Sequence, residues 1–252
     1  MKVKGVKGGD MPKYKIADVV FETNHIFEYT KKLCLDYLYM GKSAPSFCLS
    51  ITVDDIEKEK QVYFEESLPD CAYEFSCLFR KLNEQLLENH LATVFHGSAV
   101  EVDGKGYIFT APSGTGKSTH ARLWKELLGY KLNYINDDKP ILKEEDGKLY
   151  LYGSAWTGKH NLGSNIKVPL YAICKLNRGK VNKIKKADEK VILEAMLNQT
   201  FKPTTPKQAI NLMGLIDKVI KSVKLFELDC DISIESAKLS FDTMSNGEEN
   251  ED

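Results

Sequence analysis

One short stretch carries the strongest structural signal of the chain: Ala111-Pro112-Ser113-Gly114-Thr115-Gly116-Lys117-Ser118. Residues 107–110 before it are typical of a buried strand, and residues 119–128 after it have helical spacing that ends at Gly129. A strand, a glycine-rich loop closing with Gly-Lys-Ser, and a helix form the pattern of a phosphate-binding loop. The alternative is a chance glycine-rich turn before an ordinary helix, which the full match in the correct context disfavours.

The residue types in this loop suit the binding of phosphate groups. Gly114 and Gly116 let backbone N–H groups converge without an obstructing Cβ, and the start of the helix adds its positive dipole end. Lys117 would reach the β- and γ-phosphates, and the Ser118 hydroxyl would coordinate Mg²⁺. We expect ATP and Mg²⁺ here, with the nucleotide held by Ser113, Gly114, Thr115, Gly116, Lys117, Ser118 and Thr119.

The residues before the loop predict a hairpin that leads into it. Residues 93–102 and 106–110 are typical of strands, and the turn Asp103-Gly104-Lys105-Gly106 joins them. His96 lies on the first strand and could therefore reach the mouth of the loop. A lone histidine at a strand end can also have a purely structural role.

An acidic pair follows the helix after the loop. Asn136-Asp137-Asp138 comes directly after an apolar stretch, residues 130–135, that is typical of a strand. Carboxylates beside a phosphate loop can hold Mg²⁺ or accept a proton from an attacking hydroxyl. The alternative is an ordinary Asn-Asp-Asp turn that ends at Pro140.

The remaining chain predicts alternating helices and strands around this centre. We expect an N-terminal α/β region in residues 1–92, a nucleotide-binding domain in residues 93–244 and a disordered acidic tail in residues 245–252, with residues 1–12 mobile. Expected strands are residues 14–21, 47–53, 168–176 and 225–228. Expected helices are residues 25–40, 71–90, 188–201, 207–221 and 234–241.

Composition narrows the class of protein. The 252 residues carry a formal net charge of −1, so no basic excess favours a nucleic-acid partner. No apolar run is long enough for a membrane span, and the N-terminus does not resemble a secretory signal. The six cysteines form no CxxC pair and predict free thiols, which favours a cytoplasmic location. Residues 1–90 could form a cap over the substrate site or an oligomer contact, so a homo-oligomer is one alternative.

The order of these motifs resembles that of HPr kinase/phosphorylase and of the wider nucleotide-binding fold shared with phosphoenolpyruvate carboxykinase. His96-Gly97, a hairpin, the loop at residues 111–118 and then Asn136-Asp137-Asp138 follow that order, over residues 94–140. The resemblance implies a mixed-sheet α/β kinase core with a small N-terminal α/β region. Thr119 stands where classical members have Glu, and we find no copy of the family's arginine-bearing C-terminal signature.

The resemblance also implies roles for individual residues. Lys117 matches the phosphate-binding lysine, and Ser118 matches the metal-binding hydroxyl. Asp137 and Asp138 match a pair in which one residue binds metal and the other is the base; we lean toward Asp137 for metal and Asp138 for base. His96 matches a histidine close to that base. Asp138, His96 and Lys117 are therefore the expected catalytic residues.

The expected function is that of an ATP- and Mg²⁺-dependent kinase acting on a hydroxyl, with serine in a protein, a peptide or a small molecule as the expected acceptor. A nucleotide-binding regulator without efficient transfer and a carboxykinase-like lyase are the alternatives. Further along the chain, Trp156 and Lys159 lie in a glycine-rich segment that could contact substrate or simply form a solvated turn with Trp156 in the core. For His120 we expect a structural role, for His160 an exposed position, and for Arg178 a surface position in a hairpin turn.

Overall fold

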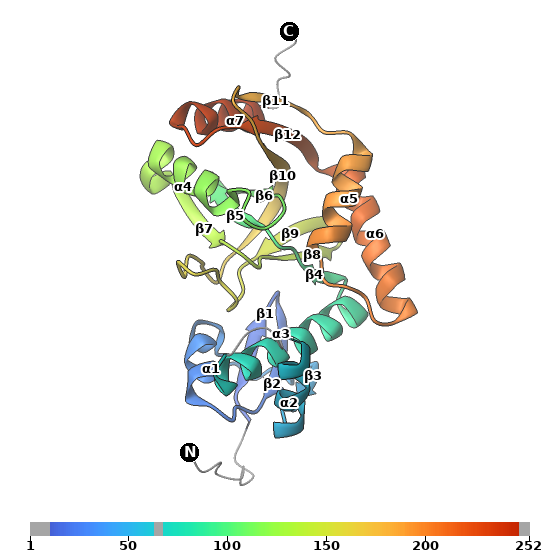
Figure 1. The fold of residues 1–252 in the computed structure, drawn as a ribbon. Coiled ribbons are helices and arrows are strands. Elements are labelled where there is room, and N and C mark those ends of the chain that lie inside the picture. Colours follow the sequence, from blue (N-terminus) through green and yellow to red (C-terminus); the bar gives the residue numbers. More distant parts are fainter. Residues whose placement is uncertain (1–10, 63–67, 247–252) are drawn as a thin grey trace.

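The computed structural model describes residues 11–62 and 68–246, which form two packed parts (Figure 1). In the N-terminal part, β1 (Lys13–Ile16) pairs with β2 (Val19–Thr23) antiparallel, and β3 (Phe47–Leu49) joins β2 in parallel. Three α-helices and a short 3-10 helix complete this part: α1 (Glu28–Leu33), η1 (Leu35–Tyr37), α2 (Val53–Val62) and α3 (Asp70–Asn89).

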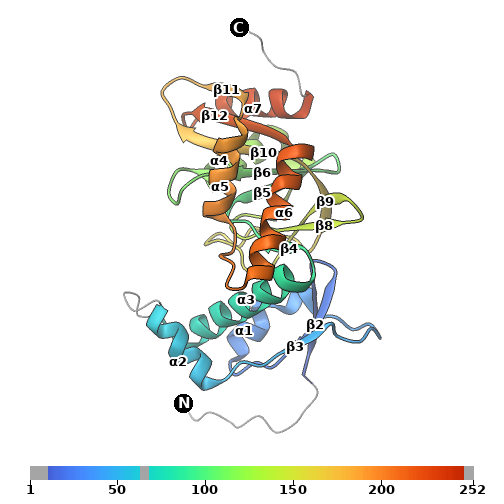
Figure 2. The same ribbon diagram turned by 90° about the vertical axis from the view of Figure 1, so that its right-hand side faces the viewer.

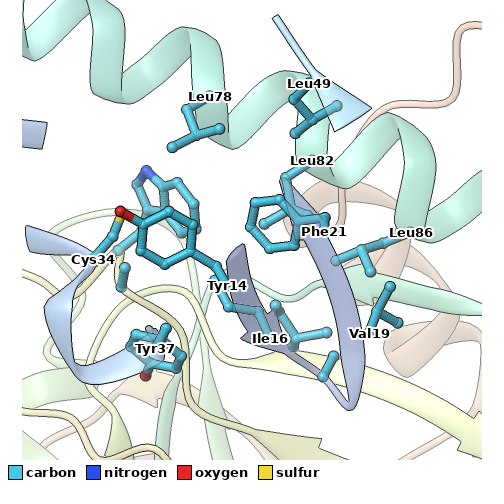
Figure 3. Close-up of a cluster of buried hydrophobic side chains, with 14 of the residues drawn as sticks. Tyr14, Ile16, Val19, Phe21, Cys34, Tyr37, Leu49, Leu78, Leu82 and Leu86 are labelled. Carbon is cyan, nitrogen blue, oxygen red and sulfur yellow. The ribbon is translucent and has the colours of Figure 1, made fainter. Parts of the chain in front are cut away.

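The core of the N-terminal part lies between its small sheet and α3. Tyr14 and Phe21 from the sheet face Leu78 and Leu82 from the helix, and all four are buried (Figure 3). Leu78, Leu82 and Leu86 recur every four residues, so they line one face of α3. The same cluster includes Trp156 from the second part, and therefore the two parts share one core.

A nine-stranded, mixed and curled sheet forms the second part. At its centre, β10 (Lys167–Arg178) lies parallel to both β6 (Lys105–Thr110) and β12 (Lys224–Cys230), while its first residues pair antiparallel with β9 (Lys148–Tyr152). The other strands are β4 (Ala92–Val94), β5 (Ser98–Val102), β7 (Leu132–Asn136), β8 (Ile141–Glu145) and β11 (Lys183–Lys186).

Helices cover both faces of this sheet. α4 (Lys117–Leu128) and α7 (Ile234–Asn246) pack on one face, whereas α5 (Glu189–Gln199) and α6 (Pro206–Ser222) cover the other (Figures 1 and 2). A short 3-10 turn, η2 (Gly129–Lys131), follows α4. Along β5 and β6, Val100 and Tyr107 join the α4 side, and Ala99 and Ile108 join the α5–α6 side. This alternation follows from the two-residue period of a strand.

The topology brings three chain segments to one edge of the sheet. β5 pairs antiparallel with both β6 and β7, with Ser98 opposite Phe109 and Ala99 opposite Asn136. The start of β5 therefore lies beside the ends of β6 and β7. His96 precedes β5, the loop at residues 111–116 follows β6, and the acidic pair follows β7.

Several expected elements differ from those of the structure. The strand expected at residues 93–102 is two strands, β4 and β5, because β4 pairs with β8 and β5 pairs with β6 and β7. Residues 25–40 contain only the short α1 and η1, and α2 begins at Val53, inside an expected strand. Ser245 and Asn246, expected in the disordered tail, belong to α7; residues 247–252 and 1–10 lie outside the described residues.

Candidate functional site

The loop between β6 and α4 has the conformation that its glycines allow. Gly114 has φ +76° and Gly116 has φ +125°, values that a side chain would strain. Gly116 is the N-cap of α4, and no side chain caps this helix end. A Cβ placed on either glycine would meet no atom within 4 Å, so the surface of the loop is open there. Open N–H groups at a helix start form an anion-binding site.

Lys117 lies at the start of α4 with little exposure to solvent. Its Nζ donates to Ala111 O at 2.9 Å and to Pro112 O at 3.4 Å, so the ammonium is held against the loop. Burial lowers the pKa of Lys117, and Lys139 adds to this, although the charge of Asp138 acts in the opposite direction. The hydrogen-bond partners of Lys117 are neutral carbonyls, and no ion pair with it is found among the described residues, which suits a group that meets phosphate.

The acidic pair is presented by a hydrogen-bonded turn built around Asn136. Its side-chain Oδ1 accepts from the backbone N–H groups of Asp138 at 2.9 Å and Lys139 at 2.7 Å. Its Nδ2 donates to the carbonyl of Ser154 at 3.0 Å. The two interpretations of this segment are therefore compatible. It forms a turn, and this turn places both carboxylates at the edge of the sheet.

Asp137 is buried beside the loop. Its Oδ1 accepts from the backbone N–H of Gly158 at 2.7 Å, whereas its Oδ2 is buried without a hydrogen-bond partner among the described residues. Burial raises the pKa of Asp137, with the neighbouring Asp138 charge adding to it. Its backbone carbonyl accepts from the Ser118 hydroxyl at 3.3 Å, so Ser118 and Asp137 are neighbours.

Asp138 has a different environment. Its Oδ1 lies 3.2 Å from His96 Nε2 and 3.4 Å from Lys139 Nζ. Burial favours a higher pKa for Asp138, but the His96 hydrogen bond and the Lys139 charge outweigh it, and the pKa is lowered. Asp138 is therefore ionised at neutral pH. Its Oδ1 has charged or polar partners, whereas Asp137 Oδ2 has none among the described residues.

One cavity of about 530 Å³ joins these groups. Nearly all of the expected site residues line it, with Thr115 the exception. The lining residues are His96, Ser113, Gly114, Gly116, Lys117, Ser118, Thr119, Arg122, Asp137, Asp138, Gly158, Lys159 and His160. Lys159 and His160 come from the glycine-rich segment after β9, and Arg122 comes from α4; Arg122 has no motif signal in the sequence.

The oxygen atoms at the site are compatible with a magnesium ion that the protein and a bound phosphate group hold together. The free Asp137 Oδ2 and the Ser118 hydroxyl are hard oxygen donors of the kind that Mg²⁺ prefers. Among the described residues, no group of three or more His, Cys, Asp or Glu side chains could hold a metal ion alone. Mg²⁺ commonly takes one or two protein ligands together with phosphate and water oxygens, so these residues fit it.

Some residues outside the loop have roles that the sequence did not predict. Arg178 is the last residue of β10 rather than part of a hairpin turn, and its Nη2 donates to Gly114 O at 2.6 Å. The expected surface position is confirmed, because Arg178 is exposed, but the hairpin turn is wrong and the contact with the loop was not predicted. His120, as expected, is structural: it is buried and its Nε2 pairs with Ser240 Oγ at 2.9 Å. Trp156 is buried in the core.

Comparisons with known proteins give little further information. No protein-family model matches the chain, and a search of curated proteins found no match. Among solved structures, the chain is similar to the Hpr(Ser) kinase/phosphatase from Coxiella burnetii, with 13% identity over 51% of this chain and 97% of the other, at a TM-score of 0.27. A likeness of this strength establishes neither family nor activity. In the part of the chain that the structure describes, no helix has both the length and the apolar character needed to cross a bilayer.

Proposed function

We propose that this chain is an ATP- and Mg²⁺-dependent kinase that transfers the γ-phosphoryl group to a hydroxyl, with serine of a protein, a peptide or a small molecule as the acceptor class. One observation carries the proposal: the glycine-rich loop, a buried carboxylate with a free oxygen and a histidine-paired carboxylate all line one cavity. Phosphoryl transfer needs these three functions together, namely phosphate binding, metal binding and proton acceptance.

Different residues of the site have different roles in phosphoryl transfer. Backbone N–H groups of the loop and Lys117 bind the phosphates, and Ser118 with Asp137 holds Mg²⁺, which neutralises charge on the phosphates when bound. Asp138 accepts the proton of the acceptor hydroxyl as the new oxygen–phosphorus bond forms and the bond to the β-phosphate breaks. His96 orients Asp138 through the 3.2 Å contact.

The lowered pKa of Asp138 is compatible with this role. A lower pKa makes the carboxylate a weaker base, but it also keeps the group ionised at neutral pH. Phosphoryl transfer passes through a loose transition state in which the attacking hydroxyl is still largely protonated. Orientation and charge therefore matter more than basicity, and a well-placed ionised carboxylate is sufficient.

Nucleotide binding and transfer are tested separately. Calorimetric titration with a non-hydrolysable ATP analogue and Mg²⁺ should show binding to the wild type and a loss of at least tenfold in affinity for Lys117→Ala. Lys131→Ala, at an exposed position after α4, is the matched control and should bind normally. No binding to the wild type would overturn the proposal.

Transfer is then followed with γ-labelled ATP, Mg²⁺ and a cell extract fractionated into proteins, peptides and small molecules. Label in a serine-bearing fraction, dependent on Lys117, supports the kinase and identifies the acceptor class. Binding without a labelled acceptor under any metal condition would overturn the kinase assignment in favour of a nucleotide-binding regulator.

A further inference from the structure

The segment between β9 and β10 bridges the cavity and the N-terminal part. We call residues 153–164 the bridging segment. Gly153 N–H donates to Ile166 O at 3.2 Å, and Ser164 N–H donates to Ile135 O at 3.2 Å, so both ends are fixed on the sheet. Near its middle, Lys159 and His160 are exposed and line the cavity.

Trp156 anchors this segment in the N-terminal part. Its ring stacks on Phe75 of α3, with centroids 4.9 Å apart and planes 17° apart, and packs against Phe79 at 5.1 Å. Its indole Nε1 donates to Phe75 O at 3.0 Å. Both the apolar body and the polar tip of Trp156 are therefore held by one turn of α3.

Only two residues separate this anchor from the buried carboxylate. Gly158 N–H donates to Asp137 Oδ1 at 2.7 Å. A Cβ on Gly158 would lie 3.1 Å from Asp137 Oδ2 and 3.2 Å from Oδ1, so an added methyl group would press on the carboxylate. Two residues span at most about 7 Å, and a shift of Trp156 would therefore move Gly158 as well.

The Gly158 hydrogen bond fixes the orientation of the carboxylate. With Oδ1 held by Gly158, the second oxygen, Oδ2, is the one left without a partner among the described residues. Groups that hold a metal ligand in place commonly change metal affinity by ten- to a hundredfold when they are removed.

We propose that α3 positions Asp137 for Mg²⁺ through Trp156 and Gly158, so that the N-terminal part sets the metal affinity of the nucleotide site. The inference rests on the proposed function, in which Asp137 holds the metal. Phe75 and Trp156 are not among the residues that line the cavity, so they are positioning residues. The N-terminal part is then a functional component of the site, although none of its side chains within residues 11–62 and 68–89 lines the cavity.

The test compares four variants by calorimetry with a non-hydrolysable ATP analogue, with and without Mg²⁺. Trp156→Ala should raise the Mg²⁺ concentration for half-maximal binding about tenfold or more, and leave metal-free nucleotide affinity within about twofold. Gly158→Ala should act similarly by displacing Asp137. Trp156→Phe keeps an aromatic ring on Phe75 and should recover most of the metal affinity.

Leu82→Ala is the control for loss of packing alone. Leu82 is fully buried in the same cluster and is not among the residues that line the cavity. This variant should lose stability yet retain the wild-type Mg²⁺ requirement. As a readout independent of ligand, the Gly158 amide should exchange with deuterium faster in Trp156→Ala than in Leu82→Ala.

Two outcomes would overturn the inference while the proposed function stands. One is an unchanged Mg²⁺ requirement in Trp156→Ala, and the other is an equal rise in Trp156→Ala and Leu82→Ala. A wild type that binds the nucleotide analogue without any effect of Mg²⁺ would instead contradict the metal role of Asp137, and the inference would fall with it.

Discussion

Asp138 is paired with His96 across the edge of the sheet, and its main chain is paired with the next residue, Gly97. Asp138 Oδ1 lies 3.2 Å from His96 Nε2, and the Asp138 carbonyl accepts from the N–H of Gly97 at 3.1 Å. A side-chain and a main-chain contact together fix the carboxylate relative to the start of β5. Asp137, one residue away, has one carboxylate oxygen held by Gly158 and the other without a partner among the described residues, and its pKa is shifted in the opposite direction. Two adjacent carboxylates with different environments are suited to different tasks.

This division of roles predicts that Asp138→Asn loses transfer but retains binding. Asparagine preserves the size of the side chain but cannot accept the proton, so transfer should fall by about 10²- to 10⁴-fold. Nucleotide affinity should remain within a few-fold of wild type, because the loop is untouched. Single-turnover transfer from γ-labelled ATP measures the first quantity and calorimetry the second. Asp146→Asn, in the exposed turn between β8 and β9, is the control, and equal transfer in both variants would refute the base assignment.

Arg178 predicts a smaller effect on nucleotide affinity. Its guanidinium donates to Gly114 O at 2.6 Å and thereby braces the loop from the end of β10. Arg178→Ala should weaken nucleotide binding by about three- to tenfold, because a single exposed charged hydrogen bond contributes on the order of 1 kcal/mol. Lys180→Ala, an exposed neighbour, should have no effect. Equal nucleotide affinities of Arg178→Ala and Lys180→Ala would show that the Arg178–Gly114 hydrogen bond does not support nucleotide binding in solution.

The sequence predicted the local parts of the site better than its long-range contacts. Strand, loop and helix around residues 107–128 form one continuous segment, and the Asp103-Gly104 turn is a local hairpin signal, with φ +49° and +75° in the structure. The break between β4 and β5 could not be predicted in this way. The break arises because β4 pairs with β8, a strand that follows the acidic turn, whereas β5 pairs with β6 and β7.

The functions of Arg178 and Trp156 illustrate the same limit. Arg178 reads as part of a turn because Gly179 and Lys180 follow it, but β10 continues to Arg178 through its parallel pairing with Cys230 of β12. For Trp156, the sequence left two alternatives open, a position in the core and a contact with substrate. Its partner, Phe75, is far away in the sequence, so only the folded chain shows that Trp156 lies in the core.

Removal of the Ser240 hydroxyl is expected to reduce stability, because this hydroxyl is hydrogen-bonded to several buried groups. Its hydroxyl accepts from Trp124 Nε1 at 2.8 Å, pairs with His120 Nε2 at 2.9 Å and donates to Ala237 O at 3.0 Å. Ser240→Ala leaves these buried groups unpaired and should cost about 2–3 kcal/mol of unfolding free energy. Urea denaturation measures the loss. Ser222→Ala, at the exposed end of α6, should change stability by about 0.5 kcal/mol or less; a similar small change for Ser240→Ala would contradict the prediction.

His25 predicts that stability falls as the solution becomes acidic. Burial lowers the pKa of His25 from 6.5 to about 4, and the nearby charge of Lys31 adds to this. The ring is held by the Tyr14 hydroxyl, which lies 2.7 Å from its Nε2. Between pH 6.5 and about 4, the unfolded chain binds a proton at His25 that the folded chain does not. The unfolding free energy therefore decreases as the pH falls through this window.

His25→Gln removes the titrating group while keeping a side chain that can pair with Tyr14. Urea denaturation at pH 7.5 and pH 5 should show a smaller loss of stability on acidification in the variant than in the wild type. Some loss should remain, because burial also lowers the pKa of His120 to about 4. Equal losses in the two proteins would mean that His25 takes up its proton in the folded state as readily as in the unfolded chain.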